Sequence, residues 1–228
     1  MTLLAWVSAF TSRIELCPSV IVLPSRQTVL FAKQLAELDI LSNGRARLGI
    51  GIGSNKDQYA ALGQDFHSRG ARCDEQLLLL KSLLTQDKVD FTGRWDTVEE
   101  SGINPLPVQS HIPIWYGGAS IPGAKVINRI ANYADGWFVL CNPEDYDDIR
   151  SKIDNAAETA NRDPKAIQTE AGVAVVGPRE SEWQSRITNW EKMGIDYICL
   201  RTLGGDLTPQ QHLDKLKEVV PQALELIT

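Results

Sequence analysis

The sequence lacks the features that mark metal sites, disulfide frameworks and nucleic-acid surfaces. Its four cysteines lie far apart without a C-x-x-C pair, and its three histidines are equally scattered. This spacing matches no common zinc-ligand pattern and favours free thiols in a reducing cytosol. The formal net charge of -6 argues against nucleic-acid binding, which needs a basic face. We therefore expect a cytoplasmic protein with no metal site and no nucleic-acid partner.

Membrane-directed segments are also scarce. Residues 3–10 are apolar, but no positively charged region precedes them, and Leu3, Leu4, Val7 and Phe10 have helical spacing. We expect a helix that faces the core rather than a signal peptide. No stretch reaches the roughly 20 apolar residues that a bilayer-spanning helix needs, so no membrane partner is predicted.

The dominant feature that is present is an alternation of short β-type runs with helical patterns. The six runs cover residues 14–22, 46–53, 112–118, 136–140, 169–176 and 197–201. The alternation predicts an α/β fold of TIM-barrel type, with functional groups at the carboxyl ends of parallel strands. Since eight strands close such a barrel, six strands predict an incomplete one. No domain boundary is recognisable, because the alternation resumes after its one irregular region, and this predicts a single domain over residues 1–228.

Several local signals predict where helices begin. Thr28 and Ser120 are capping residues ahead of helical patterns, and Asn142 stands before a proline at the first position of the next helix. Thr208 begins the capping-box pattern of the last helix.

The region between residues 87 and 113 interrupts the alternation. Alternating apolar residues on both sides of Thr92-Gly93 predict a hairpin, followed by an extended crossover rich in proline. Much earlier in the chain, Asp39 and Arg45 flank a helix end, and we expect them to form an ion pair.

Two glycine-rich strand ends are candidate ligand sites. The first is Gly49-Ile50-Gly51-Ile52-Gly53-Ser54, in which three glycines share one face of a strand. A face without side chains admits either a closely packed neighbouring backbone or a flat cofactor ring, and both interpretations stay open. The dinucleotide fingerprint G-x-G-x-x-G is not met.

The second candidate is Gly117-Gly118-Ala119-Ser120, which closes one strand and leads to a helix. Paired glycines free backbone amides, and a following helix N-terminus favours an anion, so the turn suits a phosphate. An ordinary strand–helix turn is the alternative. Both sites lie at carboxyl ends of predicted strands, where one ligand can contact both.

Ten segments together carry a resemblance to a known family. They are TSRI at 11–14, VLPSR at 22–26, AKQL at 32–35, LDILSNGR at 38–45, GIGIG at 49–53, FHSRG at 66–70, PLPVQ at 105–109, PIWYGG at 113–118, ADGW at 134–137 and RDP at 162–164. In this order they resemble the bacterial luciferase-like monooxygenase family, including its branch that uses the deazaflavin coenzyme F420.

The resemblance implies a (β/α)8 barrel that binds F420 or FMN and oxidises or reduces a small organic substrate. It also implies a non-proline cis peptide between Ser19 and Val20, beneath the cofactor ring. The cofactor-binding residues that it implies are Ser19, Val20, Ile52, Gly53, Ser54 and, for the phosphate, Gly117, Gly118, Ala119 and Ser120.

The sequence departs from the family at its beginning. Family members begin with a strand, a helix and a strand that are not found here, and those elements often supply an acid–base group. No catalytic residue is therefore assigned, and we expect either a start upstream of Met1 or a reduced barrel. The leading hypothesis is an oxidoreductase or monooxygenase, and the alternatives are a non-catalytic flavin- or F420-binding protein and a purely structural unit. Open strand edges, above all at residues 14–22, predict a homodimer.

Overall fold

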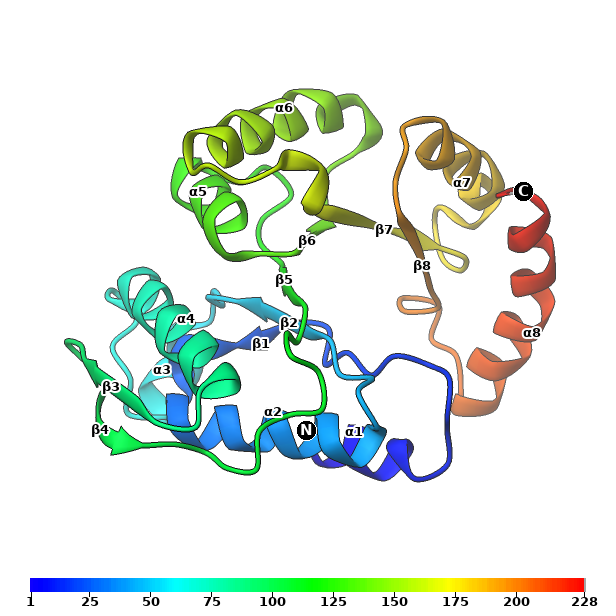
Figure 1. Cartoon of the computed structure of the whole chain (residues 1–228). Coiled ribbons are helices and arrows are strands. Elements are labelled where there is room, and N and C mark those ends of the chain that lie inside the picture. The colour runs from blue at the N-terminus through cyan, green and yellow to red at the C-terminus, as the bar shows by residue number, and fades with distance from the viewer. Residues whose placement is uncertain (228) are drawn as a thin grey trace. The chain divides into compact units, whose positions relative to one another are not determined.

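The computed structural model describes residues 1–227, which form two compact units (Figure 1). The first unit contains residues 1–118 and 133–135, and the second contains residues 119–132 and 136–227. The prediction of one domain over the whole chain stays a prediction. Each helix within the described residues is too short or too polar to cross a membrane.

The first unit combines three parallel strands with helices and a separate hairpin. Its elements are α1 (Thr2–Ser8), β1 (Ile21–Val22), α2 (Thr28–Ser42), β2 (Leu48–Gly51), α3 (Lys56–Ala61), α4 (Arg69–Thr85), β3 (Val89–Thr92), β4 (Thr97–Ser101) and β5 (Ile114–Tyr116). Strand β2 lies between β1 and β5, with Ile50 opposite Ile21 on one side and opposite Tyr116 on the other. The parallel alternation is confirmed in this unit.

The second unit repeats the alternation with three more parallel strands. Its elements are α5 (Ala124–Tyr133, whose last residue belongs to the first unit), β6 (Gly136–Val139), α6 (Pro143–Thr159), β7 (Gln168–Ala174), α7 (Trp183–Lys192), β8 (Tyr197–Arg201) and α8 (Pro209–Glu225). Strand β7 pairs with β6 and β8. Helix α6 begins at Pro143 as predicted, and Thr208 and Gln211 form the predicted capping box of α8.

The core of the first unit lies where α2 and α4 cover the sheet. Helix α2 buries Phe31, Leu35 and Leu38, and α4 buries Leu77 and Leu80 among others. Each such side chain contributes about 1.5–3 kcal/mol through removal from water. Helix α2 ends at Asn43 and Gly44, whose φ angles of 56° and 78° are left-handed, which is typical of a helix C-terminus.

The predicted hairpin is confirmed as β3 and β4, which lie beside α4 in Figure 1. A carboxylate of α4 fixes its turn: Glu75 accepts hydrogen bonds from the backbone amides of Arg94, Trp95 and Asp96 at 2.7–3.0 Å. This hairpin turn also binds Thr28 of α2, whose hydroxyl donates a hydrogen bond to Asp96 Oδ2 at 2.6 Å.

The predicted caps at Thr28 and Ser120 are wrong. Thr28 is the first residue inside α2 and is buried, because its hydroxyl is engaged by the distant Asp96. Helix α5 begins only at Ala124, where the Gly123 carbonyl accepts the first helical hydrogen bonds. Pro122 disfavours helical backbone at the residue before it, which separates Ser120 from the helix.

The first predicted strand is broken into two pieces. Leu16 forms an isolated bridge to Ala46, and the strand proper contains only Ile21 and Val22. Between them Ser19 adopts a left-handed φ of 59°, so the chain turns there. The predicted cis bond between Ser19 and Val20 is wrong: the cis bond within the described residues joins Asn104 to Pro105, and left-handed backbone at Ser19 makes the turn with trans bonds instead.

Helix α1 is present as predicted but does not face the core. Ser8 is its buried residue, whereas Leu3, Trp6 and the following Phe10 are exposed. The apolar stripe is wider than the face that contacts the rest of the unit, so its outer half reaches solvent.

All four cysteines are free thiols, Cys73 and Cys141 being buried and the other two half-buried.

Asp39 and Arg45 do not pair. Arg45 donates instead to backbone carbonyls, including those of Thr11 and Ile14 at 2.8 and 2.6 Å. Asp39 is fully buried. It accepts hydrogen bonds from Gln109 Nε2 at 2.6 Å, from the backbone N–H of Gln109 at 2.9 Å and from the backbone N–H of Ala46 at 3.3 Å. One carboxylate thus joins the end of α2 to the chain just before β2 and to the crossover that leads to β5.

Replacing Asp39 by alanine should lower the free energy of unfolding by about 3 kcal/mol, because three donors, one of them buried, lose a buried charged acceptor. Urea unfolding followed by circular dichroism measures this change. Glu37→Ala, an exposed site on the same helix, is the control and should change stability by less than about 0.5 kcal/mol. Equal urea midpoints for the two variants would contradict the assigned role of Asp39.

Candidate cofactor site

Three strands of the first unit end in close contact around Gly51. A Cβ atom on Gly51 would lie 2.9 Å from the Gly117 carbonyl oxygen and 2.9 Å from Val20 Cγ1. The Gly117 amide also donates to the Ile50 carbonyl at 2.8 Å. Glycine at position 51 therefore lets β1, β2 and the end of β5 approach each other, which supports the close-packing interpretation at this position.

Glycine is required at position 53 both by the backbone conformation and by the nearby side chain of Val22. Its φ of 64° is left-handed, and a Cβ atom there would lie 2.8 Å from Val22 Cγ1. The chain leaves β2 through this turn, with Ile52 and Gly53 half-buried and Ser54 exposed. The structure thus places Val20, Gly51 and Gly117 together, and it fixes Ile52 and Gly53 directly after them.

Two side chains that the sequence did not single out as functional hold this turn. The Tyr59 hydroxyl donates to the Ile52 carbonyl at 2.6 Å, and Arg69 Nε donates to the Gly53 carbonyl at 3.3 Å. The Arg69 guanidinium lies 3.7 Å from the centre of the Phe66 ring, which orients it. Arg69 and Phe66 belong to the segment FHSRG, so the resemblance contained this signal, whereas nothing in the local pattern indicated Tyr59.

The turn after β5 presents unused hydrogen-bond donors. Gly118, Ala119 and Ser120 are exposed, and their backbone amides donate to no other residue in the described part of the chain. The Gly117 amide, by contrast, is already bonded to Ile50. Because α5 begins four residues after Ser120, the helix dipole contributes less at this turn than the sequence predicts.

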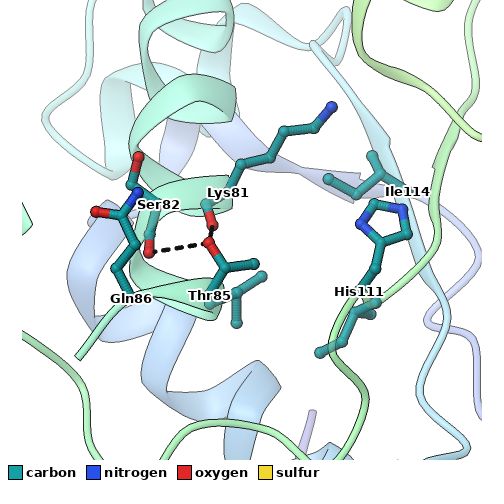
Figure 2. A pocket seen from close by; sticks show the side chains of 8 residues that line it. Lys81, Ser82, Thr85, Gln86, His111 and Ile114 are labelled. Carbon is teal, nitrogen blue, oxygen red and sulfur yellow. Dashed lines mark hydrogen bonds between the residues drawn. The ribbon is translucent and has the colours of Figure 1, made fainter.

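A cavity of about 270 Å³ in the first unit is lined by none of these residues, and Figure 2 shows the side chains around it. It is lined by Lys81, Ser82, Leu84, Thr85, Gln86, His111, Ile112 and Ile114. His111 Nε2 lies 2.8 Å from Asp135 Oδ2, which also accepts from the Ile114 amide at 2.8 Å. Ile114 opens β5, so the cavity is at the amino end of the strand, where barrel residues serve stability rather than ligand binding.

Replacing Tyr59 by phenylalanine should lower the free energy of unfolding at neutral pH by about 1 kcal/mol, because the Ile52 carbonyl loses its donor. The same change should reduce alkaline destabilisation. Burial raises the pKa of Tyr59 to about 12, whereas an unfolded chain releases this proton near pH 10. Stability therefore falls as the pH rises from about 10 to about 12, because the unfolded state binds fewer protons.

Urea midpoints at pH 8 and pH 11 measure this effect. Tyr197→Phe, which removes an exposed phenol, is the matched control and should retain the wild-type loss between the two pH values. A Tyr59→Phe variant with the same alkaline loss as the control would contradict the assignment.

Comparison with known proteins identifies the family to which the sequence is similar. The family model of luciferase-like monooxygenases matches residues 1–198. An uncharacterized protein of Mycobacterium tuberculosis is 34% identical over 167 residues, which cover 71% of this chain and 58% of that protein. An F420-dependent glucose-6-phosphate dehydrogenase of Gordonia bronchialis is 30% identical over 176 residues, covering 72% and 51% of the two chains. The matched region thus spans little more than half of these relatives.

Solved structures agree in fold. A monooxygenase from Streptomyces bottropensis superposes with a TM-score of 0.79 at 17% identity, covering 100% of this chain and 82% of that one. An F420-dependent secondary alcohol dehydrogenase in complex with an F420–acetone adduct gives a TM-score of 0.78 at 17% identity, covering 99% and 84%. The predicted fold class, an incomplete α/β barrel of TIM type with six parallel strands in the described residues, is confirmed. The chain belongs to the luciferase-like monooxygenase family.

Proposed function

We propose that the chain binds F420 or FMN at the carboxyl ends of β1, β2 and β5, as part of an oxidoreductase that acts on a small organic substrate. The observation that carries the proposal is the contact of Gly51 with both Val20 and Gly117, which joins the expected ring site to the start of the expected phosphate site. When bound, the cofactor supplies hydride transfer or, for FMN, oxygen activation, and the protein supplies binding and orientation.

The ring site fits a flat apolar group. Val20 lies against Gly51 and keeps 45% of its surface exposed, so a β-branched side chain forms a shelf at the strand ends. A ring over this shelf would bury apolar surface and exclude water from its own face. Tyr59 and Arg69 fix the carbonyls of Ile52 and Gly53, which keeps the rim of the shelf in place. Ser19 and Ser54 are exposed beside Val20 and Gly53 along the chain.

The phosphate site is the turn after β5. Three successive amides, those of Gly118, Ala119 and Ser120, donate to no other described residue, so they can donate to phosphate oxygens. Gly117 has a different role, since its amide is bonded to Ile50 and its carbonyl packs on Gly51. The amides of this turn would hold the anion without any lysine or arginine.

Of the two cofactors we favour F420. Relatives named F420-dependent glucose-6-phosphate dehydrogenases match at 30% and 26% identity, and the segment Arg162-Asp163-Pro164 is typical of that branch. FMN is the second candidate, because a riboflavin lyase solved with modified FMN also shares the fold, with a TM-score of 0.70. No residue is assigned as a catalytic acid or base.

We further propose that the chain forms a homodimer through the outer face of α1. Leu3, Trp6 and Phe10 expose 69%, 63% and 72% of their surfaces, and the Trp6 and Phe10 rings lie 4.8 Å apart. Residues 2–12 contain no charged side chain, and interface centres are depleted of charge. An uncharged apolar stripe is self-complementary across a two-fold axis, which suits a second copy. The strand edge at residues 14–22 is a weaker candidate for the dimer interface than α1, because β1 has only two residues with backbone groups that could pair with a second copy.

Replacing Gly118 by valine should weaken binding of F420 and FMN by at least about a hundredfold, because a β-branched side chain narrows the turn that carries the free amides. Calorimetric titration with each cofactor measures the affinities. Gly123→Val is the matched control, since a Cβ atom on Gly123 meets no atom within 4 Å. Unchanged affinity in the Gly118 variant would show that the phosphate lies elsewhere, and tight binding without turnover of any substrate would favour a non-catalytic binding protein.

A double substitution of Trp6 and Phe10 by serine should convert the dimer into a monomer at tens of micromolar, because it removes the largest exposed apolar groups. Light scattering gives the mass directly, against 25.2 kDa for one chain. Val108→Ser, which changes an exposed apolar residue of the crossover, should leave the dimer intact. A monomeric wild-type chain would exclude the α1 interface.

A further inference from the structure

The cavity of the first unit combines a buried apolar lining with polar side chains at its edge. Leu84, Ile112 and Ile114 line it and expose only 5%, 2% and 1% of their surfaces. Figure 2 shows α4 on one side of the cavity and His111 with Ile114 on the other. Its volume of about 270 Å³ is close to the lower limit of roughly 300 Å³ for small-molecule pockets, so the space suits a small ligand.

Most polar groups on the α4 side are already bonded within the helix. The hydroxyls of Ser82 and Thr85 donate to the carbonyls of Leu78 and Lys81 at 3.3 and 2.8 Å. The backbone N–H of Gln86 donates to the Ser82 carbonyl at 3.0 Å. The last turn of α4 therefore presents few unused hydroxyl donors and few unused carbonyls to a ligand.

Lys81 brings a positive charge to the same side of the cavity. Figure 2 shows its side chain extending from α4 toward β5, and Nζ lies 5.8 Å from the centre of the Tyr133 ring. An ammonium group has three donors and no acceptor, so it can bind an anion while it keeps its other contacts. A negatively charged ligand group is the natural partner of this side chain.

His111 limits the cavity from the other side and is fixed by a carboxylate. Its Nε2 lies 2.8 Å from Asp135 Oδ2, and that oxygen also accepts from the backbone N–H of Ile114 at 2.8 Å. The second ring nitrogen of His111, Nδ1, makes no hydrogen bond with any described residue. One face of the cavity is thus held in place by Asp135 and still has a polar atom for a ligand.

We propose that this cavity binds a small aromatic carboxylate, with its charge on Lys81 and its ring against Leu84, Ile112 and Ile114. One ammonium beside a buried apolar lining matches a ligand with one negative charge and an apolar body, whereas a phosphate monoester carries two charges and no apolar contact of its own. Within the described residues no cluster of acidic, histidine or cysteine side chains could hold a metal ion instead.

The ligand of this cavity is not the substrate of the proposed oxidoreductase. The cavity is at the amino end of β5, where the residues of a barrel serve stability. A ligand that binds only the folded chain stabilises it by mass action, so occupation should raise the thermal stability of the protein. The inference goes beyond the proposed function and does not depend on the cofactor.

Calorimetric titration of the whole chain with benzoate tests the proposal. Lys81→Gln should weaken binding at least about tenfold, because a charge-assisted hydrogen bond is lost. Thr85→Phe should abolish binding while it keeps every charge, since a larger side chain enters the cavity from its exposed edge. Lys88→Gln removes an exposed lysine that does not line the cavity, and it should bind as the wild type does.

Thermal melting of each variant without ligand identifies loss of fold. With benzoate, the melting temperature of the wild type and of Lys88→Gln should rise, and that of a folded Thr85→Phe variant should not. Absence of benzoate binding to the wild type, or binding that is unchanged in both Lys81→Gln and Thr85→Phe, would overturn the proposal.

Three further probes separate the alternatives. Benzylamine and acetate should each bind at least about tenfold more weakly than benzoate, because the first has the wrong charge and the second lacks the ring. Equal binding of either one would contradict the assignment to an aromatic carboxylate. Benzoate should bind unchanged to the Gly118→Val variant, and binding lost there would place the ligand in the cofactor site. If neither F420 nor FMN binds while the Lys81-dependent binding remains, the proposed function fails and this site stands.

Discussion

The buried carboxylate of Asp39 is the interaction on which the candidate site depends. It binds the chain at Ala46, just before β2, and at Gln109, just before β5. A buried charge is tolerated only when hydrogen bonds replace its lost hydration, so the three donors and the acceptor require one another. Because β2 and β5 run in parallel from these two points, the contact helps to set the register that brings Gly51 to Gly117 at their far ends.

The glycines that pack closely at the strand ends are also the residues at which we propose ligand binding. Gly51 has no space for a side chain because Val20 and the Gly117 carbonyl occupy it, and Gly117 uses its amide to bond Ile50. The chain therefore leaves the sheet at Gly118 with its next three amides unused. Close packing at Gly51 therefore accompanies both the exposed side chain of Val20 and the unused amide of Gly118.

Local signals predicted helix ends well where nothing distant competed for the same groups. The capping box at Thr208 and the start at Pro143 depend on neighbours a few residues away, and both are present. Thr28 failed as a cap because Asp96, far along the chain, takes its hydroxyl. The expected cis bond at Val20 failed because left-handed backbone at Ser19 turns the chain with trans bonds.

The sequence by itself determined the alternation of strands and helices, the family and the two glycine-rich strand ends, because periodicity and short motifs are local properties. Only the tertiary structure decided which side chains support those ends. Tyr59 reaches the Ile52 carbonyl from α3, and Arg201 reaches Gly172 from another strand. The hydrogen bonds of a long side chain depend on which backbone folding brings within about 3 Å, and no spacing along the chain encodes that distance.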